Sequence, residues 1–167
     1  MTTNTVKEDK ALVRDSRALR KAMLELVRLY QFRDRDRICC YDISVTQYYA
    51  IEALLRRGEL TLKQLAAELN MDKSTVSRTI ASLVRKKYVR KKDYPEDGRF
   101  VLLNATADGR KIFDRIEEDL TKELKDLICD FDPDIRRATT SLIACLAKAS
   151  KDKFIAVGLR QPETGKK

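Results

Sequence analysis

A chain of 167 residues, 43% hydrophobic and 37% charged, can build one or two small domains with a hydrophobic core. Its net charge of +9 favours a polyanionic partner, with nucleic acid ahead of an anionic membrane. The absence of histidine removes the commonest metal ligand and general base, which argues against most hydrolases and thiol proteases. Four cysteines without C-x-x-C spacing and five scattered glycines favour neither a zinc finger, nor a disulfide framework, nor a phosphate-binding loop, so we expect no catalytic residue, metal or cofactor.

The ends and the hydropathy of the chain indicate where it works. The first ten residues, MTTNTVKEDK, are polar and have no signal-peptide core. No apolar run approaches the roughly 20 residues that a membrane-spanning helix needs. We therefore expect a cytoplasmic protein with no membrane partner.

Two helices are predicted in the first third of the chain. Apolar residues recur at helical spacing from about residue 8, and the charged segment RDRDR (33–37) is expected to end this first helix. Ser44 and Gln47 form a capping-box signature at the start of a second helix. Gly58 is expected to end it.

A helix-turn-helix is predicted next. Thr61 and Gln64 repeat the capping-box signature ahead of a short third helix that runs to about Leu69. Asp72 is a favourable N-cap for a fourth helix, within the stretch MDKSTVSRTIASLVRKK (71–87). Two helices joined by three or four residues, the second with a polar outer face, are typical of a DNA-reading unit.

A hairpin and two further helices complete the predicted order. Strand-like segments at 88–92 and 99–105 flank the turn sequence YPEDG (94–98). Thr106 is expected to cap a long fifth helix, and Asp132-Pro133 to begin a sixth. The predicted fold is mainly α, a winged helix-turn-helix with a small β-hairpin wing between long flanking helices.

Positive charge is concentrated on this central unit. Residues 60–100 contain ten basic and five acidic side chains, so more than half of the net charge lies there. The outer face of the fourth helix carries Ser74, Arg78, Ser82 and Arg85, and an arginine at such a place can bind the two major-groove acceptors of guanine. The simpler alternative is a solvated helix whose charges only provide solubility.

Three sequence pieces resemble the MarR/SlyA family of winged-helix transcription regulators. LTLKQLAAELNMDKSTVSRTIASLVRK (60–86) resembles the family's helix-turn-helix, YPEDGR (94–99) its D-x-R wing signature, and TADG (106–109) its T-x-x-G segment. The likeness covers about residues 10–150. One departure is Lys87, which stands where the family usually has a glycine after the recognition helix.

This resemblance implies a homodimer that binds a pseudopalindromic duplex DNA operator. We expect a dimerisation helix at 8–37, a winged helix-turn-helix domain at 38–106, dimerisation helices at 107–152 and a flexible tail at 153–167. Arg99 would enter a minor groove, oriented by Asp97, unless Asp97 only begins the hairpin turn. The predicted DNA-contacting residues are Lys73, Ser74, Thr75, Ser77, Arg78, Lys91, Lys92, Asp97 and Arg99.

Two kinds of effector are candidates for such a regulator. Cys39 and Cys40 lie close to two arginines and are candidates for sensing an oxidant, an electrophile or a thiophilic metal or metalloid. A small aromatic molecule is the other candidate. The residues that could line a pocket for it are Tyr41, Tyr48, Tyr49 and Arg56. Tyrosines at helical spacing are more often core residues, and Cys129 and Cys145, on apolar helical faces, are expected to be small buried hydrophobes.

The predicted function is that of a non-enzymatic, sequence-specific transcription regulator, with repression expected. One alternative is a winged-helix module that binds protein and no operator, against which the concentrated positive charge argues. A thiol-based redox enzyme is the other alternative, and it lacks a histidine to activate a cysteine.

Overall fold

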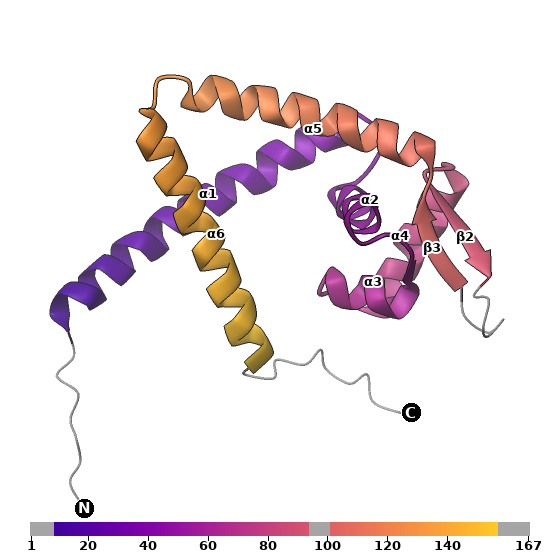
Figure 1. The fold of residues 1–167 in the computed structure, drawn as a ribbon, viewed down its shortest axis with the longest axis horizontal. Helices are drawn as coiled ribbons and strands as arrows, with labels where there is room; N and C mark the ends of the chain where they lie inside the picture. Colours follow the sequence, from indigo (N-terminus) through magenta and orange to yellow (C-terminus); the bar gives the residue numbers. More distant parts are fainter. Residues whose placement is uncertain (1–8, 94–100, 157–167) are drawn as a thin grey trace, which may run out of the picture. The chain divides into compact units, whose positions relative to one another are not determined.

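The computed structural model describes residues 9–93 and 101–156, which fall into two compact units divided between Val45 and Thr46. The order of elements is α1–α2–β1–α3–α4–β2–β3–α5–α6 (Figure 1). The expected turn at 94–98, with Asp97 and Arg99, lies outside the described residues, as does the part of the expected tail from 157 onward.

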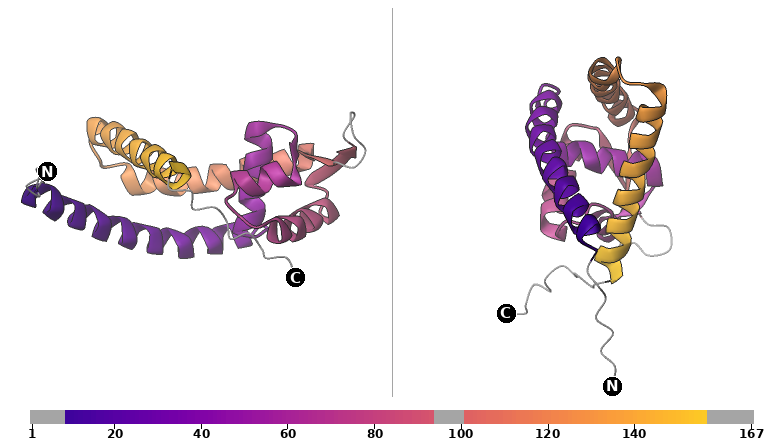
Figure 2. Two further views of the ribbon diagram at one scale, coloured as in Figure 1. Left: turned by 90° about the horizontal axis from the view of Figure 1, so that it is seen from below. Right: turned by 90° about the vertical axis from the view of Figure 1, so that its left-hand side faces the viewer.

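The first unit consists mainly of α1 (Lys10–Cys39), a continuous, gently curved helix (Figure 2). Its start is capped by Asp9, whose Oδ1 accepts hydrogen bonds from the backbone N–H groups of Ala11 (3.0 Å) and Leu12 (3.3 Å). The prediction that RDRDR ends this helix was wrong, because α1 continues through 33–37. Arginine is a good helix former and the segment contains neither glycine nor proline, so charge alternation alone does not stop the helix.

Three short helices form the core of the second unit. They are α2 (Val45–Arg57), α3 (Leu62–Glu68) and α4 (Lys73–Arg85). Each helix contributes apolar side chains that are at most 2% exposed. Those side chains include Ile51, Leu54, Leu65, Val76, Ile80 and Leu83. The helix-turn-helix predicted from the capping residues and the apolar spacing is therefore confirmed.

A small antiparallel sheet lies beside these helices, with strand order β1-β3-β2. β2 (Val89–Asp93) and β3 (Val101–Ala105) form the predicted hairpin. β1 (Leu60–Thr61) was not predicted, because it has only two residues and one of them, Thr61, is also the N-cap of α3. Thr61 therefore pairs with Leu102 of β3 and caps a helix at the same time.

α4 ends with a residue in the left-handed conformation. Glycine usually occupies such a position, and here it is a lysine. Lys87 has a φ of 64°, in the left-handed region. The N–H of Tyr88 donates to the carbonyl of Leu83 (3.0 Å), and the N–H of Lys87 donates to that of Val84 (3.0 Å). These two bonds define a Schellman motif. Lys87 therefore adopts the left-handed conformation that a glycine would adopt without strain, and the strain lies in the backbone of Lys87.

Thr106 and Gly109 join this helix end to α5 (Ala107–Ile128). The Thr106 N–H donates to the Tyr88 carbonyl (3.0 Å), and its hydroxyl donates to the Lys87 carbonyl (2.7 Å). The same hydroxyl accepts from the Gly109 N–H (3.0 Å) and so caps α5. The T-x-x-G segment therefore fixes α5 to the junction between α4 and β2.

The last helix, α6 (Pro133–Ala156), begins at the predicted proline and runs past the expected start of the tail at 153. α5 and α6 both carry large apolar side chains that are 40–60% exposed in the single chain. Those residues are Leu124, Leu127, Ile135, Leu142 and Ile143. A face this apolar is normally covered by a partner.

Candidate nucleic-acid interface

The first turn of α4 is organised by Asp72. Its Oδ1 accepts a hydrogen bond from the Thr75 N–H (2.8 Å) and another from the Ser74 hydroxyl (2.5 Å). Hydrogen bonding by Ser74 and Thr75 holds the pKa of the Asp72 carboxyl well below its usual range. The carboxylate is ionised at neutral pH, which suits the positive end of the helix dipole.

The polar face predicted on α4 is largely present. Lys73, Ser74, Ser77 and Arg78 are exposed, while Thr75 is half-buried and accepts a hydrogen bond from the Arg78 guanidinium (3.2 Å). The opposite face of α4 packs into the core. One strip of α4 therefore offers two hydroxyls and two cations, which are side chains that can bind phosphates and base edges.

Ser82 is an exception to the predicted outer face. It is half-buried, and its Oγ accepts a hydrogen bond from the Gln47 amide of α2 (2.9 Å). Ser82 therefore belongs to the contact between α2 and α4. Ser82 lies at the edge of the buried face of α4. Helical spacing alone does not predict whether a residue at this edge contacts another helix or is exposed.

The strands of the hairpin carry further basic side chains. Lys91 and Lys92 of β2 are exposed, as predicted, and so is Arg90. Lys92 is not simply solvated, because its Nζ lies 3.3 Å from the Glu59 carboxylate. The sequence reasoning missed Glu59, which precedes β1 and meets β2 only through the sheet.

Comparisons with known proteins agree with this geometry. Residues 41–99 match the MarR family. The chain is 23% identical over 122 residues to the HTH-type transcriptional regulator YdgJ of Bacillus subtilis (strain 168), covering 70% of this chain and 74% of that one. The resemblance to MarR-family transcription regulators that the sequence motifs indicated is therefore confirmed over residues 41–99.

Solved structures of MarR-family proteins share the fold. A MarR transcriptional regulator from Methanosarcina mazei Go1 is 26% identical, with a TM-score of 0.66 over 81% of this chain and 98% of that one. A MarR family protein from Bacillus stearothermophilus is 20% identical, with a TM-score of 0.71 over 84% and 96%. The predicted fold class, a mainly helical winged helix with a small antiparallel sheet, is confirmed.

The cysteines of the chain differ in how they are placed. Cys40 is exposed, just after the end of α1, while the side chain of Cys39 lies outside the described part of the structure. Cys129 and Cys145 are also exposed, so the expectation that they are buried was wrong for the single chain. The reason is that Cys129 lies in the turn directly after α5, and Cys145 lies on α6, where large apolar side chains such as Leu142 are themselves exposed.

The predicted aromatic pocket is not assembled in the way proposed. Tyr48 is buried, stacks on Phe113 of α5 with 5.3 Å between ring centroids, and donates its hydroxyl hydrogen bond to Glu117. Burial and then Glu117 raise the pKa of the Tyr48 hydroxyl well above its usual range. Tyr49 is 48% exposed. Tyr48 therefore joins α2 to α5 as a core residue.

Arg56, the cation considered for that pocket, is held by carboxylates. Its guanidinium pairs with Glu52 (3.0 Å) on its own helix and with Glu68 of α3 (2.7 Å). Glu68 also pairs with Arg57 (3.3 Å). Arg56 thus connects α2 to α3, and an anionic effector would have to compete with two carboxylates for it.

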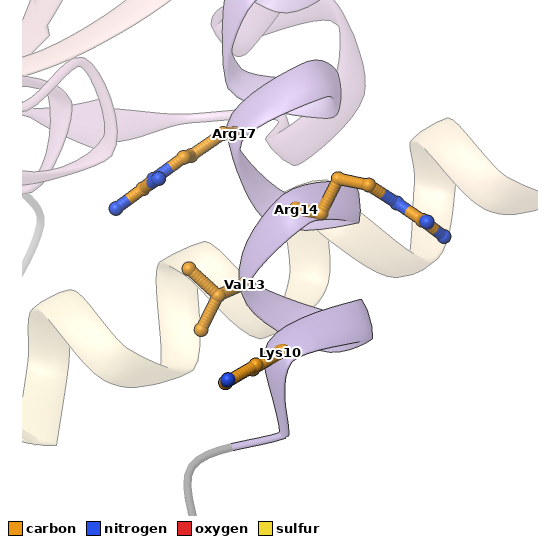
Figure 3. Close-up of a pocket in the computed structure, with 4 residues that line it drawn as sticks. All are labelled: Lys10, Val13, Arg14 and Arg17. Carbon is orange, nitrogen blue, oxygen red and sulfur yellow. The ribbon is translucent and has the colours of Figure 1, made fainter.

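A hollow lies at the start of α1, lined by Lys10, Val13, Arg14 and Arg17 (Figure 3). All four lining residues come from the first turns of one helix, so the hollow is open to the side. We place no ligand there. In the described ranges, 9–93 and 101–156, no helix is long and apolar enough to cross a membrane.

Proposed function

We propose that this chain is a sequence-specific transcription regulator that acts as a homodimer on a pseudopalindromic DNA operator in the cytoplasm, as a repressor. The observation that carries the proposal is the exposed strip of α4, where Ser74, Ser77 and Arg78 lie on the second helix of a MarR-type helix-turn-helix. A helix of this kind enters the major groove, and its first turns reach base edges.

The proposed DNA contacts divide by role. Arg78, with Ser74 and Ser77, would read bases, because these side chains are exposed on α4. Lys73, Lys91 and Lys92 would bind phosphates. Asp97 and Arg99 remain proposed minor-groove residues on the strength of the wing signature alone.

The dimer is proposed from the uncovered apolar faces. α5 and α6 expose side chains such as Leu127 (60%) and Leu142 (55%), and α1 exposes Leu12 (63%) and Leu29 (63%). Apolar helical faces of this extent stabilise a protein only when they are buried, and a second copy with the same faces meets that need symmetrically. Two helix-turn-helix units would then read two half-sites about one helical turn apart.

Release of the operator is proposed to follow either ligand binding or modification of Cys39 or Cys40. The exposure of Cys40 supports the thiol route, because an oxidant or electrophile has access to its sulfur. A small aromatic molecule remains the alternative effector.

The test is selection of binding sites from random duplex DNA by the full-length reduced protein. A two-fold-symmetric site, bound by two chains, is the expected result. The selected site is then titrated before and after mild oxidation, with a Cys39→Ser/Cys40→Ser variant as the control. If oxidation abolishes binding by the native protein and not by the variant, release occurs through the thiols. If oxidation leaves the affinity of the native protein unchanged, the thiol route is refuted. If no sequence is enriched, the operator-binding proposal fails.

A further inference from the structure

The carboxylate of Glu59 lies beside basic side chains on one face of the sheet. It directly precedes β1, and the β1–β3 register, which pairs Leu60 with Leu103, carries it to the level of Asn104. The register between β2 and β3 pairs Arg90 with Asn104. Because side chains alternate along a strand, Arg90, Lys92 and Asn104 share one face of the sheet.

Two side chains of that face bind the Glu59 carboxylate. Lys92 Nζ lies 3.3 Å from Glu59 Oε1, and Asn104 Nδ2 lies 3.3 Å from the same oxygen. Lys92 and Asn104, with a further contribution from Arg90, also hold the pKa of Glu59 below its usual value. Glu59 is therefore ionised at neutral pH, and it lies next to β1, whereas the cation that it binds lies on β2.

We propose that Glu59 is an internal counterion that occupies Lys92 and limits the affinity of the hairpin for DNA phosphates. This inference rests on the proposed DNA-binding function. A lysine that contacts a phosphate releases a condensed cation from DNA, which strengthens binding and makes it salt-dependent. A carboxylate at 3.3 Å competes with the phosphate for the same ammonium group and repels the phosphate.

The consequence for a regulator concerns its overall affinity for DNA. Phosphate contacts are independent of sequence, so a weaker phosphate contact lowers the affinity for operator and non-specific DNA by a similar factor. Base contacts from α4 are unaffected by Glu59. The carboxylate thus weakens binding to all DNA and leaves the ratio of operator to non-specific binding unchanged.

The test compares the native chain with Glu59→Gln on a duplex of unrelated sequence, by fluorescence anisotropy over a range of KCl concentrations. Glutamine keeps an oxygen that can accept the hydrogen bond from Asn104. We expect Glu59→Gln to bind the duplex about three- to tenfold more tightly at 0.1 M KCl, with a plot of log K against log salt steeper by about 0.9. Unchanged or weaker binding with the native slope overturns the proposal.

A double-mutant cycle separates Glu59's effect on Lys92 from a general change in charge. Lys92→Gln should lower the salt slope by about 0.9 in the Glu59→Gln background, and by clearly less when Glu59 is present. An equal effect of Lys92→Gln in both backgrounds refutes the pairing. Asp134→Asn on α6, a carboxylate paired with Arg137, changes the net charge equally and should leave the slope unchanged. If the native chain shows no salt-dependent DNA binding at all, the proposed function fails first.

Discussion

Gly109 lies directly against the backbone of Tyr88: a Cβ built on Gly109 would be 2.2 Å from the Tyr88 carbonyl oxygen. That oxygen also accepts the hydrogen bond from the Thr106 N–H. The neighbour is backbone and already bonded, so it cannot move aside as a flexible side chain would. The glycine of the T-x-x-G segment is therefore required by the close approach of α5 to the end of α4.

We expect Gly109→Ala to destabilise the protein by about 2 kcal/mol, even though alanine is the better helix former. Urea unfolding at a fixed protomer concentration measures this change. Gly58→Ala is a useful comparison, because Gly58 has open space around its Cα and a φ of 81°. It should cost about 1 kcal/mol through backbone strain alone. An equal or smaller cost at Gly109 would contradict the close-approach argument.

Lys87→Gly should stabilise the protein by about 0.5–1 kcal/mol. The lysine pays for a left-handed backbone at φ 64°, and glycine removes most of that strain while adding flexibility to the unfolded chain. The matched control is Lys86→Gly, one residue earlier, where φ is −78° and glycine should destabilise instead. Opposite signs at two adjacent lysines, measured by urea unfolding, are the expected result, and a loss of stability at both positions would refute it.

Stability should depend on Asp72 in a pH-dependent way. Hydrogen bonds from Ser74 and Thr75 lower the pKa of this carboxyl in the folded state. Its ionised form therefore stabilises α4 at pH values above 3.8, which is the ordinary pKa of the group. That contribution is lost as the pH falls below 3.8 toward the folded-state pKa. The melting temperature of Asp72→Ala should therefore lie below that of the native protein at pH 7, with the gap narrowing below about pH 4.

Asp72→Asn separates the charge from the cap in that experiment. Asparagine still accepts the N-cap hydrogen bond and does not titrate. Its melting temperature should lie above that of Asp72→Ala at pH 7, by an amount that does not change between pH 7 and pH 3. A native-to-alanine gap that is constant over the whole range would show that the carboxylate is not the stabilising form.

Arg78 should determine sequence preference in operator binding. Arg78→Ala is expected to cost about 1–3 kcal/mol on the selected site and to relax preference at one base pair, as seen by repeating the site selection. Lys91→Ala is the contrasting variant. It should weaken all sequences alike and lower the salt slope by about 0.9, as a phosphate contact does. A uniform loss with Arg78→Ala would remove Arg78 from base recognition.

The helix starts of the second unit could be predicted because their signals are local. The side chains of Thr61, Asp72 and Thr106 each accept a hydrogen bond from a backbone N–H three residues on, and this pattern can be read from the sequence alone. The end of α1 could not be predicted in the same way. A charged segment without glycine or proline carries no stop signal, so its effect depends on tertiary context.

The contacts that modify the candidate interface were the least predictable. Glu59 and Lys92 are 33 residues apart and meet only because β3 pairs with both β1 and β2. Gln47 and Ser82 are separated by 35 residues and join two helices. Periodicity assigns a residue to a face of its own element, but it does not show which residue of another element lies opposite.

Gln47 and Tyr48 are neighbours on α2, and their side chains bind different helices, α4 through Ser82 and α5 through Glu117 and Phe113. α4 and α5 are therefore linked at two separate places, through α2 and through Thr106 and Gly109. A single link would allow α5 to rotate relative to α4, and the second link prevents this rotation. We expect α4 to keep its orientation relative to α5, so that the spacing between two DNA-reading helices in a dimer is decided where one α5 meets the other chain.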